Sequence, residues 1–72
     1  ENVSIFSFSP NPCTHFLNVD NVKINTSYKI YNQLGKLELQ GKIDRQIDIK
    51  LLTNGIYFLS IEGYSVQKFI KQ

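Results

Sequence analysis

Cys13 and His15 are the residues whose types and spacing could do chemistry. A thiol and an imidazole two residues apart would share one face of a strand, where the imidazole could serve as base for a cysteine nucleophile. No third group is in evidence to orient that base, and 72 residues leave no spare volume for a pocket. We therefore predict no catalytic residues, with Cys13 acting as a small hydrophobe and His15 lying at the surface.

The sequence also argues against metal or cofactor chemistry. One cysteine and one histidine cannot form an internal disulfide or a zinc site. Glu38, Asp44 and Asp48 form no paired-carboxylate arrangement, and the aspartate spacing matches no calcium loop. No glycine-rich loop is present that could hold a phosphate. We predict no metal site and no cofactor.

Composition limits the partners and the number of domains. Eight basic and six acidic residues give a formal charge of +2, and the basic residues are scattered, so we predict no nucleic-acid partner. No apolar run approaches the ~20 residues of a membrane span, so we predict no direct membrane insertion. A chain of 72 residues makes a single domain, 1–72, that buries only ~60% of its unfolded surface. Because it contains no methionine, we expect it to be a fragment of a longer polypeptide.

Apolar and polar residues alternate along most of the chain, which is the period of strands and not of helices. The expected strands span residues 3–8, 15–20, 28–31, 36–40, 46–50, 56–61 and 65–70. Three pairs of apolar residues are expected to point inward: Leu17 and Val19, Leu37 and Leu39, and Ile47 and Ile49. The nearly continuous apolar run 56–61 predicts a central strand that is buried on both faces.

Proline and glycine mark the places where strands end. Pro10 closes the first strand because it cannot donate to a ladder. Gly35 is expected to take a positive φ in a tight turn, and Gly41 to end the strand that follows. Leu51 and Leu52 are expected to plug the end of the core. About seven strands at spacings of roughly 8–12 residues predict an all-β fold, a small immunoglobulin-like or Greek-key β-sandwich.

Short motifs follow one another in order across nearly the whole chain. They are Pro10-Asn11-Pro12, Phe16-Leu17-Asn18-Val19, Leu34-Gly35-Lys36, Leu52-Thr53-Asn54-Gly55-Ile56-Tyr57 and Lys68-Phe69-Ile70-Lys71. Each motif alone is common in proteins. Their order and spacing resemble the type A C-terminal sorting domain of the Bacteroidetes type IX secretion system, also called the Por secretion system. Cys13 departs from the small or apolar residue expected after the first motif.

This resemblance implies that the domain labels a protein for secretion. A larger secreted protein would carry the domain at its end and enter the periplasm by its own signal peptide. The type IX outer-membrane translocon and its shuttle proteins would recognise the folded domain. A sortase-like cysteine protease would then remove it, and the fused cargo would be secreted or held at the cell surface.

Under this resemblance, the candidate residues for binding the translocon are Pro10, Asn11, Pro12, Gly55, Tyr57, Lys68 and Lys71. Each of them also has a purely structural explanation. The prolines form a rigid turn, the glycine permits a backbone that a Cβ would block, and the tyrosine buries its ring with its hydroxyl bonded at an edge. The lysines either protect the edge of a terminal strand from aggregation or meet an acidic surface of the translocon.

The sequence leaves a second function open. The chain would then be a generic immunoglobulin- or fibronectin-like accessory module that spaces domains or binds carbohydrate. Tyr28, Tyr31 and Tyr64 are the candidate aromatic platforms for a sugar. The absence of tryptophan, and the position of most Phe and Tyr residues within strand patterns, argue against this alternative.

Overall fold

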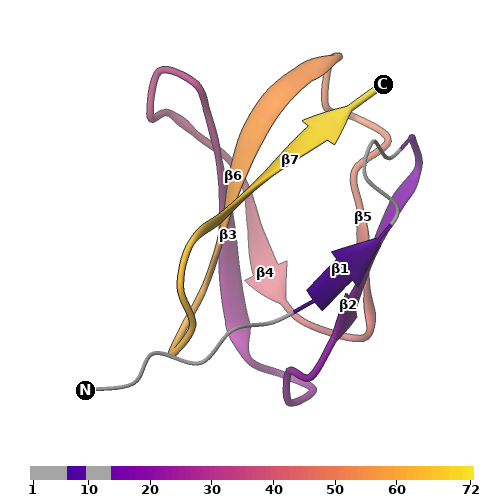
Figure 1. The fold of residues 1–72 in the computed structure, drawn as a ribbon, viewed down its shortest axis with the longest axis vertical. Coiled ribbons are helices and arrows are strands. Elements are labelled where there is room, and N and C mark those ends of the chain that lie inside the picture. The colour runs from indigo at the N-terminus through magenta and orange to yellow at the C-terminus, as the bar shows by residue number, and fades with distance from the viewer. Residues whose placement is uncertain (1–6, 10–13) are drawn as a thin grey trace.

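The computed structural model describes residues 7–9 and 14–72, which form strands joined by short turns (Figure 1). The strands are β1 (Ser7–Ser9), β2 (Phe16–Asp20), β3 (Ser27–Asn32), β4 (Leu37–Lys42), β5 (Gln46–Asp48), β6 (Gly55–Ile61) and β7 (Gln67–Lys71). These described ranges contain no helix. Most of the first predicted strand, residues 3–6, lies outside them.

The strands pair into two antiparallel sheets that face each other (Figure 1). One sheet has the order β1-β2-β5, and the other has the order β4-β3-β6-β7. The chain crosses from one sheet to the other after β2, after β4 and after β5. The prediction of a small all-β sandwich is therefore confirmed.

One apolar core fills the space between the sheets, because alternate side chains of each strand point toward the opposite sheet. The inward pairs predicted on β2 and around β5 are buried as expected. The core consists of Leu17, Val19, Ile30, Ile43, Ile47, Ile49, Leu52, Tyr57, Leu59, Ile61 and Phe69. Both sheets contribute, so neither sheet can bury its inner face without the other.

The prediction that β6 is buried on both faces is wrong. Tyr57, Leu59 and Ile61 are buried, whereas the side chains that alternate with them, including Ile56 and Phe58, are only half-buried. The strand is central in its sheet, but within the described part of the chain no further layer covers the outer face of that sheet. An apolar run thus forms a strand with one buried face and one partly open face.

The inward orientation predicted for Leu37 is also wrong, while Leu39 packs against the core as predicted. The register between β3 and β4 shifts after Ile30, which pairs with Leu39, so that Tyr31 pairs with Leu37. Such a bulge adds a residue to one strand and reverses the side-chain alternation beyond it. As a result, 39% of Leu37 is exposed on the outer face.

Gly41 does not end its strand as predicted, since β4 continues to Lys42. Gly41 pairs with Tyr28 on β3, and the tyrosine ring lies directly over the glycine. A Cβ at this position would approach Cε2 of the ring to 3.2 Å, which is tighter than ordinary van der Waals contact. The glycine is there to make room for a neighbouring ring.

The turn between β3 and β4 forms as predicted, with Gly35 at a φ of 84°. The side chain of Asn32 holds this turn together. Its Oδ1 accepts hydrogen bonds from the backbone N–H groups of Leu34 at 2.9 Å and Lys36 at 3.0 Å. An asparagine that bonds to backbone N–H groups beyond it stabilises a tight turn in this way.

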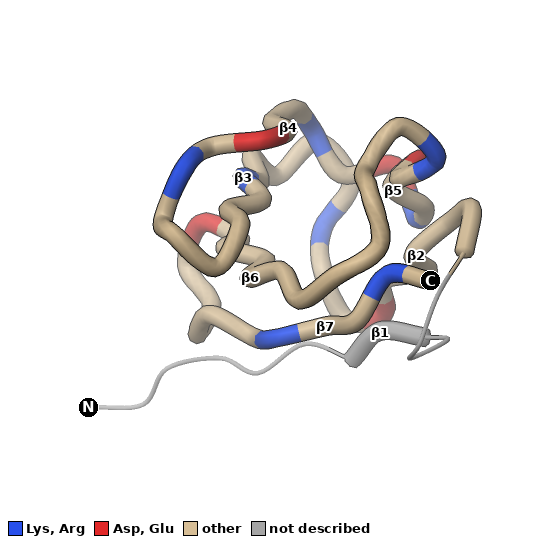
Figure 2. Tube along the Cα trace, turned by 90° about the horizontal axis from the view of Figure 1, so that it is seen from above, with Lys and Arg blue, Asp and Glu red and all other residues tan. Residues whose placement is uncertain are grey.

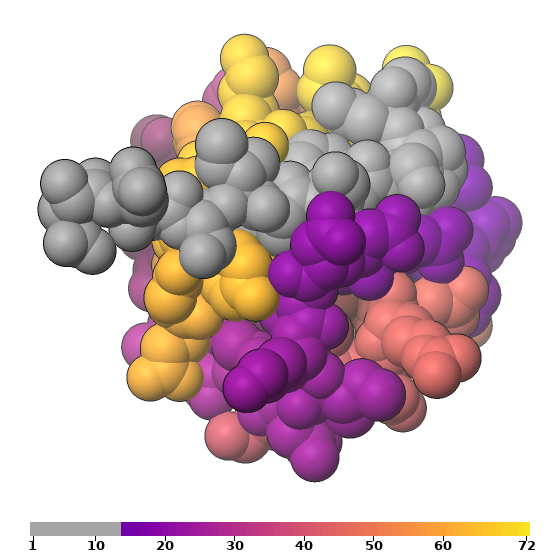
Figure 3. Space-filling model, turned by 60° about the horizontal axis from the view of Figure 1, so that its bottom comes forward, coloured from indigo at the N-terminus to yellow at the C-terminus, as the bar shows by residue number. Residues whose placement is uncertain are grey.

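Loops from both sheets meet at one end of the sandwich, the end brought forward in Figure 3. The backbone N–H of Asn25 donates to Ile43 O at 2.7 Å, and the N–H of Ile43 donates to Thr26 O at 2.8 Å. The hydroxyl of Tyr64, in the β6–β7 loop, donates to Asn21 O at 3.1 Å. These hydrogen bonds join the loops at this end of the sandwich to one another and so fix how the two sheets meet.

Leu51 and Leu52 offer a matched test of the core. Leu52 is 7% exposed and plugs the core as predicted, whereas Leu51 is 92% exposed and does not. We expect Leu52→Ala to lower the free energy of unfolding by about 2–4 kcal/mol because it removes packed methyl groups and leaves a cavity. Leu51→Ala should change it by less than about 0.5 kcal/mol. Urea denaturation of both variants checks this, and equal losses would contradict the assigned core.

Candidate functional site

The predicted binding residues divide between two parts of the chain. Pro10, Asn11 and Pro12 lie outside the described residues. The remaining four, namely Gly55, Tyr57, Lys68 and Lys71, all lie on the hairpin of β6 and β7. Strand pairing therefore brings together residues that are up to 16 positions apart in the sequence.

On this hairpin, Gly55 pairs directly with Lys71, and Tyr57 pairs with Phe69. Lys71 points inward and is only 7% exposed, and its Nζ donates to the backbone oxygen of Gln72 at 3.4 Å. Lys68 pairs with Phe58 and is exposed on the outer face. The two lysines of the motif thus point to opposite faces of one sheet.

Tyr57 is built into the core as predicted, with 4% of its surface exposed. Its hydroxyl donates to the backbone oxygen of Thr53 at 2.7 Å and lies 3.2 Å from the Thr53 Oγ1. Its ring stacks on Phe69 with the centroids 5.7 Å apart. The residue therefore anchors the segment before β6 to the hairpin.

A shallow hollow of about 210 Å³ lies between the β3–β4 turn and the start of β6. Two motifs that are separate in the sequence line it, because Asn32 pairs with Tyr57 in the sheet. Its lining residues are Asn32, Gln33, Leu34, Asn54, Gly55, Ile56 and Tyr57. Both motifs, at the β3–β4 turn and before β6, stand out in the sequence, but only the pairing of β3 with β6 makes them neighbours.

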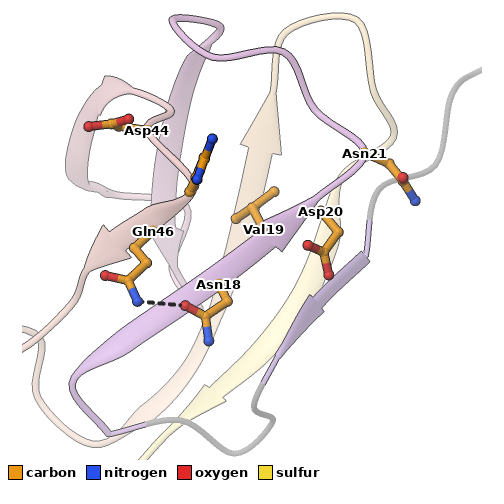
Figure 4. A pocket seen from close by; sticks show the side chains of 7 residues that line it. Asn18, Val19, Asp20, Asn21, Asp44 and Gln46 are labelled. Atoms are coloured by element: carbon orange, nitrogen blue, oxygen red, sulfur yellow. Dashed lines mark hydrogen bonds between the residues drawn. The ribbon is translucent and has the colours of Figure 1, made fainter.

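A second, polar pocket of about 650 Å³ lies along β2 and the start of β5 (Figure 4). Gln46 Nε2 donates to Asn18 Oδ1 at 2.9 Å, and Arg45 has a positive φ of 70°. Asp20 and Asp44 also line this pocket. The expectation that the chain leaves no volume for a pocket is therefore wrong, and the signal in the sequence was the run of polar residues at the outward positions of β2 and β5. The amide, carboxylate and guanidinium groups of this pocket can form hydrogen bonds.

The described residues contain no group of three or more His, Cys, Asp or Glu side chains that could hold a metal ion. His15 is exposed, as predicted, and its Nδ1 lies 3.2 Å from the Oγ1 of the neighbouring Thr14. Cys13 lies outside the described residues.

The three tyrosines suggested as a sugar platform do not all lie on one surface. Tyr28 points inward and packs over Gly41. Tyr31 pairs with Phe58 and lies on the outer face of the four-stranded sheet. Tyr64 lies in the β6–β7 loop and packs against the core. The three rings therefore do not form one common platform, although Tyr28 and Tyr31 both line a hollow of about 410 Å³.

A family model described as "Secretion system C-terminal sorting domain" matches residues 7–72 of the chain. This chain belongs to that family. The matched stretch contains every strand from β1 to β7, and therefore both sheets of the sorting domain. No curated protein and no solved structure matched the chain.

Membership confirms the resemblance drawn from the ordered motifs. The sorting domain is a C-terminal signal for type IX secretion, and it interacts with the type IX machinery. Such a signal implies export across the outer membrane to the cell surface or the medium. The family is not a family of enzymes. None of the described residues forms a helix that is long and apolar enough to cross a membrane.

Tyr57→Phe tests the anchor between the hairpin and the segment that precedes β6. Loss of the hydroxyl leaves the Thr53 carbonyl without its 2.7 Å donor, so we expect the free energy of unfolding to fall by about 0.5–1.5 kcal/mol. Tyr31→Phe is the control, because no hydrogen bond to the Tyr31 hydroxyl occurs within the described residues. Urea denaturation measures both, and an unchanged midpoint for Tyr57→Phe would refute the anchor.

Tyr28 predicts a pH dependence. Burial of the ring, and then the negative charge of Asp48, raises the pKa of its hydroxyl above the ordinary value of 10.0. As the pH rises, the unfolded chain loses this proton before the folded domain does, so folding becomes less favourable above about pH 10. We expect the stability of the wild type to fall more steeply than that of Tyr28→Phe between about pH 9 and pH 11. Parallel stability curves would show that the tyrosine does not contribute.

Proposed function

We propose that this sorting domain directs a fused cargo protein through the type IX outer-membrane translocon and is then cut off by a sortase-like cysteine protease. The observation that carries the proposal is the family match over residues 7–72, which takes in the complete sandwich. The chain is then the last domain of a larger secreted protein that enters the periplasm by its own signal peptide. The released cargo reaches the medium or is held at the cell surface.

The residues proposed for recognition act in two different ways. Gly55, Tyr57 and Lys71 are held within the β6–β7 hairpin, where they keep the strands in register. Lys68 instead presents an exposed charge to a translocon component or shuttle protein. We also assign Pro10, Asn11 and Pro12 to recognition, on the strength of their match to the family motif.

A reporter fusion tests the proposal. A secreted reporter with a signal peptide would be joined to residues 1–72 and produced in a Bacteroidetes host that has a type IX system. We expect the reporter to leave the cell and to lose about the mass of the domain, 8.3 kDa. Deletion of residues 64–72 removes β7 and with it Phe69 from the core, and should hold the reporter in the periplasm.

The matched control is the same fusion in a host that lacks the translocon, where the reporter should remain in the periplasm. Equal export with and without residues 64–72 would refute the role of the domain as the sorting signal. Export of a reporter that keeps its full mass would refute the cleavage step alone.

A further inference from the structure

The outer face of the four-stranded sheet carries a line of apolar and aromatic side chains. Leu37, Tyr31 and Phe58 are successive cross-strand neighbours on β4, β3 and β6, and Lys68 on β7 continues the line. We call the first three the apolar row. Leu37 is 39% exposed, and the two aromatic residues are half-buried. Within the described part of the chain, no second layer covers this row.

Two lysines lie beside the apolar row, and Figure 2 marks basic positions on β7 in blue. Lys68 lies at its β7 end, and Lys29 lies on β3 two residues before Tyr31, on the same face. Both lysines are exposed. No carboxylate within the described residues forms a salt bridge with either of them, whereas Lys50 pairs with Asp48 on the other sheet at 3.6 Å.

Two acidic residues of the described chain lie near this face. Glu38 receives a hydrogen bond from Asn32 Nδ2 at 2.9 Å, beside the β3–β4 turn. Glu62 follows β6 and lines a hollow of about 410 Å³ together with Lys29 and Tyr31. Apart from Glu38, the strands β3, β4, β6 and β7 contain no acidic residue, and the charged side chains at their other outward positions are lysines.

The outer face of the three-stranded sheet is different. Its outward positions on β2 and β5 carry one aromatic ring, Phe16, among the amides and carboxylates of Asn18, Asp20, Gln46 and Asp48. Phe16 is 40% exposed, and Lys50 Nζ lies 5.5 Å from its ring centroid. The described part of the sandwich thus has one mainly polar outer face with a single ring, and one outer face with the apolar row and lysines beside it. Packing in the core does not account for the outward residues of either sheet, since these side chains point away from the core.

We propose that the outer face of the four-stranded sheet docks a protein whose contact patch is apolar at its centre and carries carboxylates at its rim. The apolar row supplies the desolvated centre of the interface, and Lys29 and Lys68 meet the carboxylates. Tyr31 and Phe58 are half-buried, so they leave little free surface for insertion into a bilayer. A second copy of the domain fits this face less well, because the outward positions of β2 and β5 offer one large apolar side chain, Phe16, and the Lys50 cation lies 5.5 Å from its ring.

This inference rests on the proposed function, to which it adds the surface through which the type IX machinery engages the domain. It leaves the buried hairpin residues in a structural role. The residues on which docking then depends are not part of the core, so they could be replaced without disturbing core packing. The charged rim would govern the rate and specificity of encounter, and the apolar row the lifetime of the complex.

Site-specific photo-crosslinking in the reporter fusion tests the docking surface. The photoreactive residue p-benzoylphenylalanine would replace Tyr31 or Phe58, and would replace Gln46 on the opposite sheet as the control position. We expect a protein crosslink from the first two positions and none from the third. Mass spectrometry of the crosslinked peptide should find apolar residues flanked by Asp or Glu.

A pair of charge reversals tests the rim. The double variant Lys29→Glu with Lys68→Glu should lower the crosslink yield on the order of tenfold, because two attractive pairs become repulsive. The control, Lys23→Glu with Lys50→Glu, makes the same change in net charge away from this face and should leave the yield unchanged. Since all four lysines are exposed, both variants should keep the urea midpoint of the wild type.

Several results would overturn the docking surface. They are no crosslink from positions 31 and 58, an equal crosslink from position 46, a crosslink to lipid or to a second copy, or equal losses in the two double variants. Failure of the proposed function is separate, because it shows as retention of the unlabelled fusion. The signal peptide still brings that fusion to the periplasm, where the crosslinks report on the face independently.

Discussion

The pairing of β3 with β6 is the interaction on which the rest of the structure depends. It joins the hairpin of β3 and β4 to the hairpin of β6 and β7, and so makes one four-stranded sheet from two hairpins. It places Ile30 opposite Leu59 at the centre of the core. It also sets Asn32 beside Tyr57, which brings the turn motif next to the motif before β6.

A thin core explains why so many motif residues are structural. A domain of 72 residues buries a smaller fraction of its surface than a larger domain does, so each inward side chain contributes a large share of the stability. Tyr57 and Phe69 stack within the core, and Gly55 and Lys71 lie next to them on the hairpin. The proposed recognition therefore falls to side chains that point outward, because those that point inward hold the fold.

The two outer faces show how a small sandwich separates these tasks. The alternation of side chains along a strand lets one residue pack in the core while the next faces a partner. On β7, Phe69 is buried while Lys68 is exposed, and on β6, Leu59 is buried while Phe58 is partly open. On the proposed docking surface, these outward side chains come into line only when the strands are paired, which ties the proposed recognition to the folded state.

The sequence by itself determined the all-β class, most strand positions, the inward pairs on β2 and around β5, the turn at Gly35 and the family. These follow from local alternation, turn residues and ordered motifs, which need no knowledge of neighbours. Only the tertiary structure decided the outward position of Leu37, the one-sided burial of β6 and the opposite burial of Leu51 and Leu52. The reason is physical. A bulge depends on how two strands pair, and the burial of a face depends on which elements cover it, whereas the sequence pattern describes each strand by itself.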